Sequence, residues 1–229
     1  MMENQLKREI ITTADGSTTI HLPELNEQYH SKHGAINEAK HVFIKNGFDY
    51  VLGLGVLKKL NILEIGFGTG LNAFITFLEA EKINQKIHYV GVEAYPVAFD
   101  EAILMNYSAE LSTEEKEPIF ELLHQSAWEV PFEISPDFVL TKRKQFFVDI
   151  EDKDIFNLIY FDAFGARVQP ELWTVEIFQK MYNALQPKGV LVTYSAKGSV
   201  RRAMQEVGFQ VERLPGPPGK REMLRATKV

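Results

Sequence analysis

The chain contains no cysteine among its 229 residues. This absence excludes disulfide bonds, zinc sites built from thiolates and a thiol nucleophile together. No apolar run reaches the ~18 residues that a membrane-spanning helix needs, and no positively charged leader followed by an apolar stretch opens the sequence. From these absences we predict a cytoplasmic protein that has no metal site and no association with a membrane.

An excess of positive charge is also missing. Lys and Arg number 25 against 31 Asp and Glu, which gives a formal net charge of −6. A protein that coats nucleic acid without selectivity needs a basic surface, so this balance argues against that class. It leaves room for a local basic patch that docks one structured RNA. The length suits one sizeable core, either as one domain or as one domain with an extension.

What the chain does contain is a glycine-rich loop between a short apolar strand and a helix. The segment reads Asn61-Ile-Leu-Glu-Ile-Gly-Phe-Gly-Thr-Gly-Leu-Asn72. Its three alternating glycines allow a sharp turn and a close approach to a ligand. One apolar helical face follows at once, formed by Leu71, Phe74, Ile75 and Leu78. Strand, glycine loop and helix in this order are typical of the first unit of a nucleotide-binding α/β sheet.

The spacing of the glycines indicates which nucleotide is bound. A dinucleotide fingerprint, G-x-G-x-x-G/A, needs a small residue where this chain has the bulky Leu71. The pattern G-x-G-x-G, with Glu64 two residues upstream, resembles motif I of the class I S-adenosylmethionine-dependent methyltransferases. Glycines also serve plain tight turns, so the loop alone is a weak signal.

An acidic residue ends the next predicted strand. The run Lys86–Ala94 is rich in β-branched and aromatic residues and places Glu93 a little over twenty residues after the last glycine of the loop. An acid at the carboxyl end of the second strand can accept hydrogen bonds from both ribose hydroxyls, although a solvated carboxylate is the alternative. Loop and acid together predict a cofactor site formed by Glu64, Gly66, Phe67, Gly68, Thr69, Gly70, Asn72 and Glu93.

A third strand end carries the predicted catalytic residue. The continuous apolar run from Ile155 to Asp162 predicts a central parallel strand that is buried on both faces and ends at Asp162. Ligands of open α/β sheets bind at the carboxyl ends of the strands, so Asp162 should lie beside the ligand held by the glycine loop. A turn-forming or helix-capping role is the alternative.

The remaining segments predict an α/β alternation with an N-terminal extension (1–58) that packs on a core (59–229). The expected elements before the core are a hairpin over 10–20, a polar link over 22–29 and a helix from Ser31 that ends near Gly47. Within the core we expect an acid-rich helical stretch over 95–137 broken by Pro118, Pro131 and Pro136, and a strand over 138–147 interrupted by Lys142-Arg143-Lys144. A solvated strand end is the main interpretation of that basic triplet, and an RNA-facing surface is the alternative.

The C-terminal part predicts a turn over 187–189, a buried strand over 190–195 and a helix that Gly208 ends. Helix-packing residues expected before this strand are Leu172, Phe178, Met181 and Leu185, with Pro170 opening their helix. A rigid Pro-Gly turn then leads into a last strand.

Several segments, taken in order, resemble the methyltransferase part of the MnmC family. They are Tyr29–Gly34, Val42–Phe43, Glu64–Asn72, Phe161–Phe164, Pro170–Trp173, Thr193–Arg202, Gly208–Phe209, Pro215–Gly216 and Lys220–Met223. The likeness covers roughly residues 20–227. It implies a class I fold, with a Rossmann-like, seven-stranded, mostly parallel sheet whose last strand is reversed. It also implies S-adenosylmethionine as the methyl donor and S-adenosylhomocysteine as the product.

The resemblance implies methyl transfer to the 5-aminomethyl group of a (2-thio)uridine at the wobble position of tRNA. Bifunctional members of the family also carry a flavin-dependent oxidase domain, for which 229 residues leave no room. We therefore expect a stand-alone enzyme without flavin, supplied by a separate oxidase or pathway. One departure concerns adenine recognition, since Phe146 and Phe147 stand where many such enzymes have an acid. Gln145 and Asp149 are the candidates to replace it.

The implied roles of the side chains follow from the chemistry. Asp162 would act as a base for the amine or would orient it. Phe164 or Trp173 would stack on the everted uracil, with core packing as the alternative for both. Contacts with phosphates of the anticodon loop are assigned to Arg201, Arg202, Lys220 and Arg221, each of which is otherwise an ordinary surface charge.

Three rival functions remain open at this point. A methyltransferase that acts on a small amine needs the same loop and acid but no basic rim. An aminopropyltransferase of the spermidine-synthase type also combines a G-x-G-x-G loop with an acidic amine site, although the segments around Trp173 and Lys220 count against it. A tRNA-binding module without enzymatic activity would have no need of Glu93.

Overall fold

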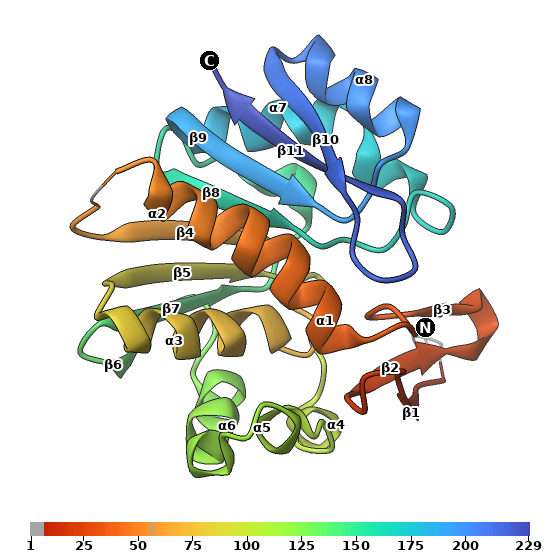
Figure 1. The fold of residues 1–229 in the computed structure, drawn as a ribbon, viewed down its shortest axis with the longest axis vertical. Helices are drawn as coiled ribbons and strands as arrows, with labels where there is room; N and C mark the ends of the chain where they lie inside the picture. Colours follow the sequence, from red (N-terminus) through yellow and green to blue (C-terminus); the bar gives the residue numbers. More distant parts are fainter. Residues whose placement is uncertain (1–6, 56) are drawn as a thin grey trace.

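The computed structural model describes residues 7–55 and 57–229. A large sheet crosses the molecule and carries helices on both faces (Figure 1). Its strands are β4 (Leu60–Ile65), β5 (Ile87–Val92), β6 (Pro131–Ser135), β7 (Phe138–Arg143), β8 (Phe156–Phe161), β9 (Leu185–Thr193), β10 (Phe209–Pro215) and β11 (Glu222–Lys228). They lie in the order β10-β11-β9-β8-β4-β5-β7-β6.

The strand directions confirm the predicted class. β4 pairs in parallel with β5 and β8, and the parallel pairing continues to β7 and β9. The last strand, β11, is antiparallel to both neighbours. An eighth strand, β6, adds to the seven expected and pairs antiparallel with β7 at the edge. The sequence did not predict it because a proline usually marks a break, whereas Pro131 is tolerated as the first residue of a strand at the sheet edge.

A continuous helical stretch packs across one face of the sheet. It consists of α1 (Ala35–Ala39), the π-helix η2 (Lys40–Phe48) and α2 (Asp49–Gly53), so the predicted end near Gly47 is wrong. A Cβ atom on Gly47 would lie 3.0 Å from Val192 Cγ2 and 3.3 Å from Tyr160 Cε1. This glycine therefore allows the helix to approach β8 and β9 closely and does not end it.

The other helical segments follow the predicted alternation. They are α3 (Leu71–Ile83), α4 (Phe99–Ala102), α5 (Tyr107–Glu110), η3 (Glu114–Lys116), α6 (Glu117–Gln125), η4 (Phe147–Asp149), η5 (Pro170–Trp173), α7 (Val175–Ala184) and α8 (Gly198–Glu206). Pro118 does not break the acid-rich stretch as predicted. It lies in the first turn of α6, where its missing N–H group has no partner to lose. No helix in the described part of the chain is long and apolar enough to span a bilayer.

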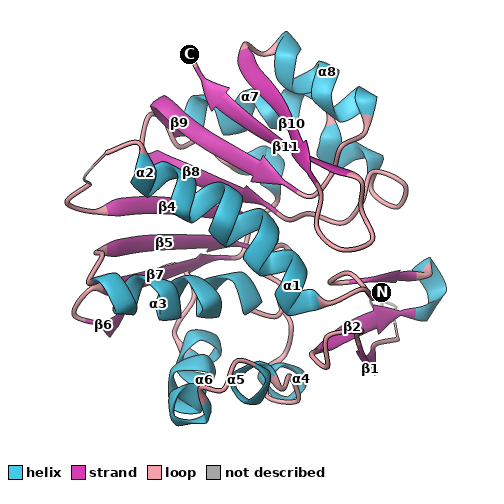
Figure 2. Ribbon diagram, in the orientation of Figure 1, coloured by secondary structure: helices cyan, strands magenta, loops and turns pink. Residues whose placement is uncertain are grey.

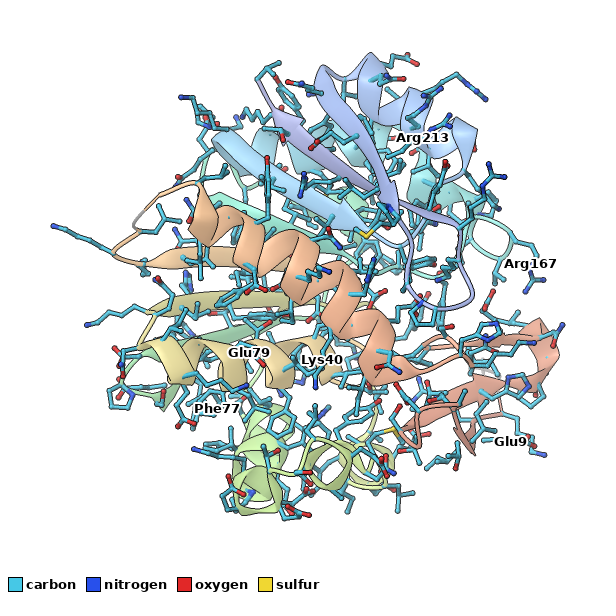
Figure 3. The ribbon with its side chains drawn as sticks, viewed as in Figure 1. Glu9, Lys40, Phe77, Glu79, Arg167 and Arg213 are labelled. Atoms are coloured by element: carbon cyan, nitrogen blue, oxygen red, sulfur yellow. The ribbon has the colours of Figure 1, made fainter. Side chains whose placement is uncertain are left out.

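The core divides into two layers because successive strand residues point to opposite faces. On β8, Leu158 and Tyr160 pack with the helical stretch that begins at α1 and with α3 and α6. Ile159 and Phe161 pack on the other face with α7 and α8. Figure 2 shows α1 and α3 in front of the sheet and α7 behind it, and Figure 3 places the buried Phe77 between α3 and α6. The prediction that this strand is buried on both faces is confirmed.

A small antiparallel sheet lies beside the N-terminal end of α1 (Figure 1). It contains β1 (Glu9–Thr12), β2 (Thr18–Leu22) and β3 (Glu27–Gln28), with the 3-10 turn η1 (Pro23–Leu25) before β3. The predicted hairpin is confirmed by the pairing of Ile10 with Ile20. The predicted polar link contains β3, whose two residues are too few to show a period. The predicted division into an extension (1–58) and a core (59–229) stays a prediction. The helices α1, η2 and α2 of the extension pack on the large sheet.

The fold positions the glycine loop through one close contact between Gly91 of β5 and the ring of Phe67. A methyl group on Gly91 would overlap that ring. We predict that Gly91→Ala lowers the free energy of unfolding by about 1–3 kcal/mol, the usual cost of overpacking a core. Gly53→Ala is the matched control, because no atom lies within 4 Å of its added Cβ. Urea unfolding measures both, and equal stabilities of the two variants would contradict the packing described.

Candidate active site

A cavity of about 510 Å³ opens at the carboxyl ends of β4, β5 and β8. Gly66, Glu93 and Asp162, each of which follows one of these strands, all line it. The three predicted strand ends therefore meet at one site, where ligands of open α/β sheets bind. In the part of the chain that the structure describes, no group of three or more acidic, histidine or cysteine side chains is arranged to hold a metal ion.

The glycine loop forms a narrow turn against the neighbouring strand end. Gly66, Gly68 and Gly70 have φ values of +88°, +50° and +73°, which favour glycine over other residues. A Cβ on Gly66 would lie 2.8 Å from the carbonyl oxygen of Asp162. A Cβ on Gly68 would lie 3.1 Å from the ring of Tyr29. Side chains at these positions would push the loop away from Asp162 and fill the cavity.

Glu93 connects this loop to the second strand. Its carboxylate accepts hydrogen bonds from the backbone N–H groups of Gly68 (3.1 Å) and Tyr95 (3.0 Å). Burial raises the pKa of Glu93 above its ordinary value. The side chain lines the cavity, so it also remains available to a ligand there.

Asn72 joins two acids at the base of the cavity. Its side-chain nitrogen donates to Glu64 Oε1 at 2.9 Å and to Asp162 Oδ2 at 2.8 Å. Glu64 is completely buried, and burial raises its pKa well above the ordinary value. Among the described residues, Asn72 Oδ1 is buried without a hydrogen-bond partner, and Asn72 lines the cavity whereas the predicted site residue Glu64 does not. An unsatisfied acceptor of this kind is costly, and the ammonium group of a bound amino acid would satisfy it.

Asp162 has the electrostatic character of a general base. Burial raises the pKa of its carboxyl group to about 7, and the negative charge of Glu38 adds to this effect. The hydrogen bond from Asn72 and the positive charge of Lys220 oppose it. An acid with a pKa near neutrality exchanges a proton readily under physiological conditions.

Two aromatic rings form one wall of the cavity. Tyr29 and Phe164 meet edge to face with their centroids 5.0 Å apart, and both line the site. Arg167, labelled in Figure 3, ties the segment after Phe164 to the small sheet through a 3.1 Å ion pair with Glu27. Trp173 lies outside the cavity lining. It is 5% exposed, and its Nε1 donates to the carbonyl oxygen of Phe164 at 2.8 Å, so it supports the wall from the core.

The wall of the cavity that follows β7 is apolar. Phe146, Phe147 and Val148 line the cavity there, whereas Gln145 and Asp149 line a separate depression. The two polar residues considered for adenine therefore lie outside the cavity lining. An apolar surface at this place suits a flat heterocycle through contact with its faces.

The other predicted site residues divide between the cavity and its surroundings. Phe67 lines the cavity, whereas Thr69 and Gly70 are not among its lining residues. The hydroxyl of Thr69 lies 2.9 Å from that of Tyr107. Gly70 packs against His124, whose ring nitrogen hydrogen-bonds the carbonyl of Thr69 at 3.0 Å. These two positions shape the loop from its outer side.

The predicted basic residues have different environments. Arg202 and Arg221 are exposed, while Lys220 forms an ion pair with Glu38. In the basic triplet, Lys142 is 1% exposed, which contradicts a solvated strand end for that residue. Its Nζ donates to the carbonyl oxygen of His124 at 2.5 Å. Burial lowers the pKa of Lys142 to about 8.

Sequence reasoning assigned no role to several residues that shape the site. Tyr29 and Phe146 were noted only as part of matching or departing segments, and Glu38 was not singled out. These residues come from separate loops and from the start of α1, where neither strand nor helix periodicity marks them. A signal existed only for residues that follow a predicted strand.

The residues present fit S-adenosylmethionine. The glycine turn leaves room that any Cβ would fill, Glu93 offers acceptors, and Asn72 Oδ1 has no hydrogen-bond donor. The apolar wall of Phe146 to Val148 completes a site for a nucleoside joined to an amino acid.

Comparisons with known proteins agree with this assignment. Residues 129–229 match a family of S-adenosyl-L-methionine-dependent methyltransferases. The bifunctional tRNA 5-methylaminomethyl-2-thiouridine biosynthesis protein MnmC of Paracidovorax citrulli is 29% identical over 224 residues, which cover 89% of this chain and 33% of that protein. MnmC of Pseudomonas aeruginosa is 28% identical over 220 residues, or 87% and 32% of the two chains. The chain thus spans about a third of the length of these curated relatives.

Solved structures show the same fold. The crystal structure of MNMC2 from Aquifex aeolicus has a TM-score of 0.73 at 23% identity and matches 98% of this chain and 71% of that one. Spermidine synthase from Thermotoga maritima has a TM-score of 0.59 at 14% identity, with 100% and 71% covered. Fold, cavity and matches together support an MnmC-like, S-adenosylmethionine-dependent methyltransferase of class I.

Proposed function

We propose that the chain transfers a methyl group from S-adenosylmethionine to the 5-aminomethyl group of a wobble uridine in tRNA. The observation that carries this proposal is Asp162, a base with a pKa of about 7 held at the cofactor cavity in a chain similar to MnmC proteins. Those relatives are named for the biosynthesis of 5-methylaminomethyl-2-thiouridine in tRNA. Incubating the protein with aminomethyl-uridine tRNA and the methyl donor, followed by mass analysis of the nucleosides, tests the proposal.

The chemistry requires a neutral amine that is aligned with the methyl group. When bound, S-adenosylmethionine supplies a methyl group already activated by a sulfonium. The task of the protein is to orient the amine and remove one of its protons. A carboxylate oxygen of Asp162 accepts that proton, and the N–H···O bond from Asn72 keeps the carboxylate in place. Asp162 thus acts as a base without forming a bond to the substrate carbon.

The aromatic wall supports a nucleobase as the carrier of the amine. A wobble base is reached when it is unstacked, and aromatic faces are the usual partners of such a base. Phe164 and Tyr29 offer these faces beside Asp162. A small aliphatic amine, as in the rival methyltransferase or aminopropyltransferase, would have no use for them. The likeness to spermidine synthase concerns the fold and does not favour that rival.

The proposed substrate also determines which reaction must come first and where the protein acts. Methyl transfer to an amine requires that the aminomethyl group exists first, so a separate oxidase or another pathway must produce it. A tRNA substrate also implies activity in the cytoplasm. The reaction itself uses no flavin and no metal ion.

The surface that would face tRNA lies beyond the carboxyl end of β9. Lys197, Arg201 and Arg202 stand at the start of α8, directly after that strand, and Arg221 lies in the loop between β10 and β11. They thus belong to the same edge of the sheet as the cavity. Lys220 is engaged by Glu38, and Arg143 by Asp152 at 2.7 Å, so both are poorer candidates for phosphates.

A first prediction concerns the cofactor. We expect wild-type protein to bind S-adenosylmethionine in the micromolar range, about −7 to −8 kcal/mol. Glu93→Ala and Gly68→Val should each bind at least about tenfold more weakly, because the first removes an acceptor and the second places a side chain at φ +50° beside Tyr29. Isothermal titration calorimetry measures this, with the exposed Glu115→Ala as the control. Undiminished binding by both cavity variants would overturn the cofactor site.

A second prediction separates binding from chemistry at Asp162. Asp162→Asn should keep most of its cofactor affinity and lose roughly 10²-fold or more in kcat. In the wild type, kcat/KM should rise about tenfold per pH unit up to about pH 7, where Asp162 loses its proton, and then level off. The exposed Asp149→Asn is the control and should behave as wild type. Near-normal turnover by Asp162→Asn would show that the carboxylate only forms a turn and takes no part in the reaction.

A third prediction addresses the RNA surface. The double variant Arg202→Ala, Arg221→Ala should weaken tRNA binding and lower the slope of log K against log salt by about one unit per lost phosphate contact. Cofactor binding should stay unchanged. The control Lys58→Ala, Lys59→Ala removes the same charge from the amino end of β4, on the opposite edge of the sheet. Equal affinity and salt dependence of the two double variants would favour the small-amine alternative.

A further inference from the structure

An ion pair lies close to Asp162 but outside the lining of the cavity. Glu38 of α1 and Lys220 of the loop between β10 and β11 form this pair, with side chains 9% and 31% exposed. Glu38 uses both oxygens, since Oε1 accepts from Lys220 Nζ and Oε2 accepts from the backbone N–H of Ser31 at 3.0 Å. The carboxylate is therefore fixed in orientation as well as in place.

Lys220 is held equally firmly. Its Nζ lies 3.7 Å from the centre of the Tyr194 ring. The hydroxyl of Tyr194 donates to the carbonyl oxygen of Ala163, the residue after Asp162, at 2.8 Å. The loop that carries Lys220 is anchored at its start by a 2.8 Å hydrogen bond between His41 Nε2 and the carbonyl oxygen of Pro215. The helix α1 and the loop between β10 and β11 thus bring one negative and one positive charge near Asp162.

Stability alone is a weak reason to keep these charges. Removing two charges from water costs free energy that an ion pair recovers only in part, and apolar residues of similar size often serve at least as well. The position of the pair suggests a different reason. Lys220 lies over the ring of Tyr194, whose hydroxyl donates to the carbonyl oxygen of Ala163. The charge of Glu38 raises the pKa of Asp162 and the charge of Lys220 lowers it.

Other ionisable groups near Asp162 contribute less variable charge. They are Glu64 of β4, Tyr89 of β5, Tyr107 of α5 and Tyr194 after β9. Burial raises the pKa of each of these groups, so the three tyrosines are uncharged near neutral pH. Glu93 and His30 also line the cavity, and burial raises the pKa of Glu93 and lowers that of His30 to about 4, which leaves the imidazole neutral near pH 7. Glu38 and Lys220 are therefore the two opposite charges that act on Asp162 beside the effect of burial.

We propose that Glu38 and Lys220 are a positioning pair whose opposite charges balance at Asp162 and so hold the pH at which it accepts the proton of the substrate amine. The role rests on the proposed function only for the identity of that amine. Neither residue touches the amine, and each acts through its charge on Asp162. Burial makes Asp162 a base suited to neutral pH, where a carboxylate in water would be too weak, and the balanced pair keeps it there.

The test uses charge-removing variants of the full chain. Glu38→Gln leaves the charge of Lys220 unbalanced and should lower the Asp162 titration midpoint by about one pH unit. Lys220→Met leaves the charge of Glu38 unbalanced and should raise it by a similar amount. The double variant should return near the wild-type midpoint, and Lys220→Arg, which keeps the charge, should do the same.

Two readouts separate this proposal from the proposed function. The Asp162 carboxyl titration is followed by NMR in protein labelled with ¹³C-aspartate, with Asp162→Asn to assign the signal, and this needs no RNA. The acid limb of kcat/KM is measured with aminomethyl-uridine tRNA. Opposite NMR shifts without any methyl transfer by the wild type would overturn the tRNA substrate and leave the pair standing. Methyl transfer with an unshifted midpoint in Glu38→Gln, or a double variant that stays away from the wild-type midpoint, would overturn the pair, even if Lys220→Met fails to fold.

Discussion

The amide of Asn72 is the constraint on which the site depends. It donates to two carboxyl groups, one from the end of β4 and one from the end of β8, and so fixes the first turn of α3 against both strands. A buried carboxyl group without a donor is costly, which forces the amide nitrogen toward the acids and its oxygen away from them. The same side chain thus organises Asp162 and offers a free acceptor to the ligand.

Close backbone approach makes this arrangement possible. Asp162 N donates to the carbonyl oxygen of Ile65 at 2.9 Å, and Gly66 then turns so near to the Asp162 carbonyl that no Cβ fits between them. In the neighbouring strand β5, Gly91 leaves the space that the ring of Phe67 occupies. The cofactor loop is therefore shaped from both neighbouring strands. Its form follows from glycines in two separate segments, the loop itself and β5, and no single motif contains that information.

The sequence predicted the parts of the site that follow from sheet topology. Asp162 and Glu93 were predicted because parallel strands end at one edge, and the glycine loop because it stands between an apolar strand and an amphipathic helix. Trp173 and Lys142 show the limit of such reasoning, because neither periodicity nor composition reveals that one supports a wall from the core and the other donates to a backbone carbonyl. The continuation of the first helix past Gly47 also depends on a contact with Val192, far away in sequence.

The charge of the chain and the charge of its proposed substrate agree once burial is considered. A protein with net charge −6 should repel a polyanion, yet burial raises the pKa of Glu93 and Asp162, two of the acids that line the cavity. Raised pKa values reduce the negative charge that these groups present at neutral pH. Lys197 and Arg202, which follow β9, are exposed at the same edge. Phosphates would then meet exposed cations at the rim, while the amine meets one proton acceptor inside, so a modest number of well-placed charges would outweigh the net charge.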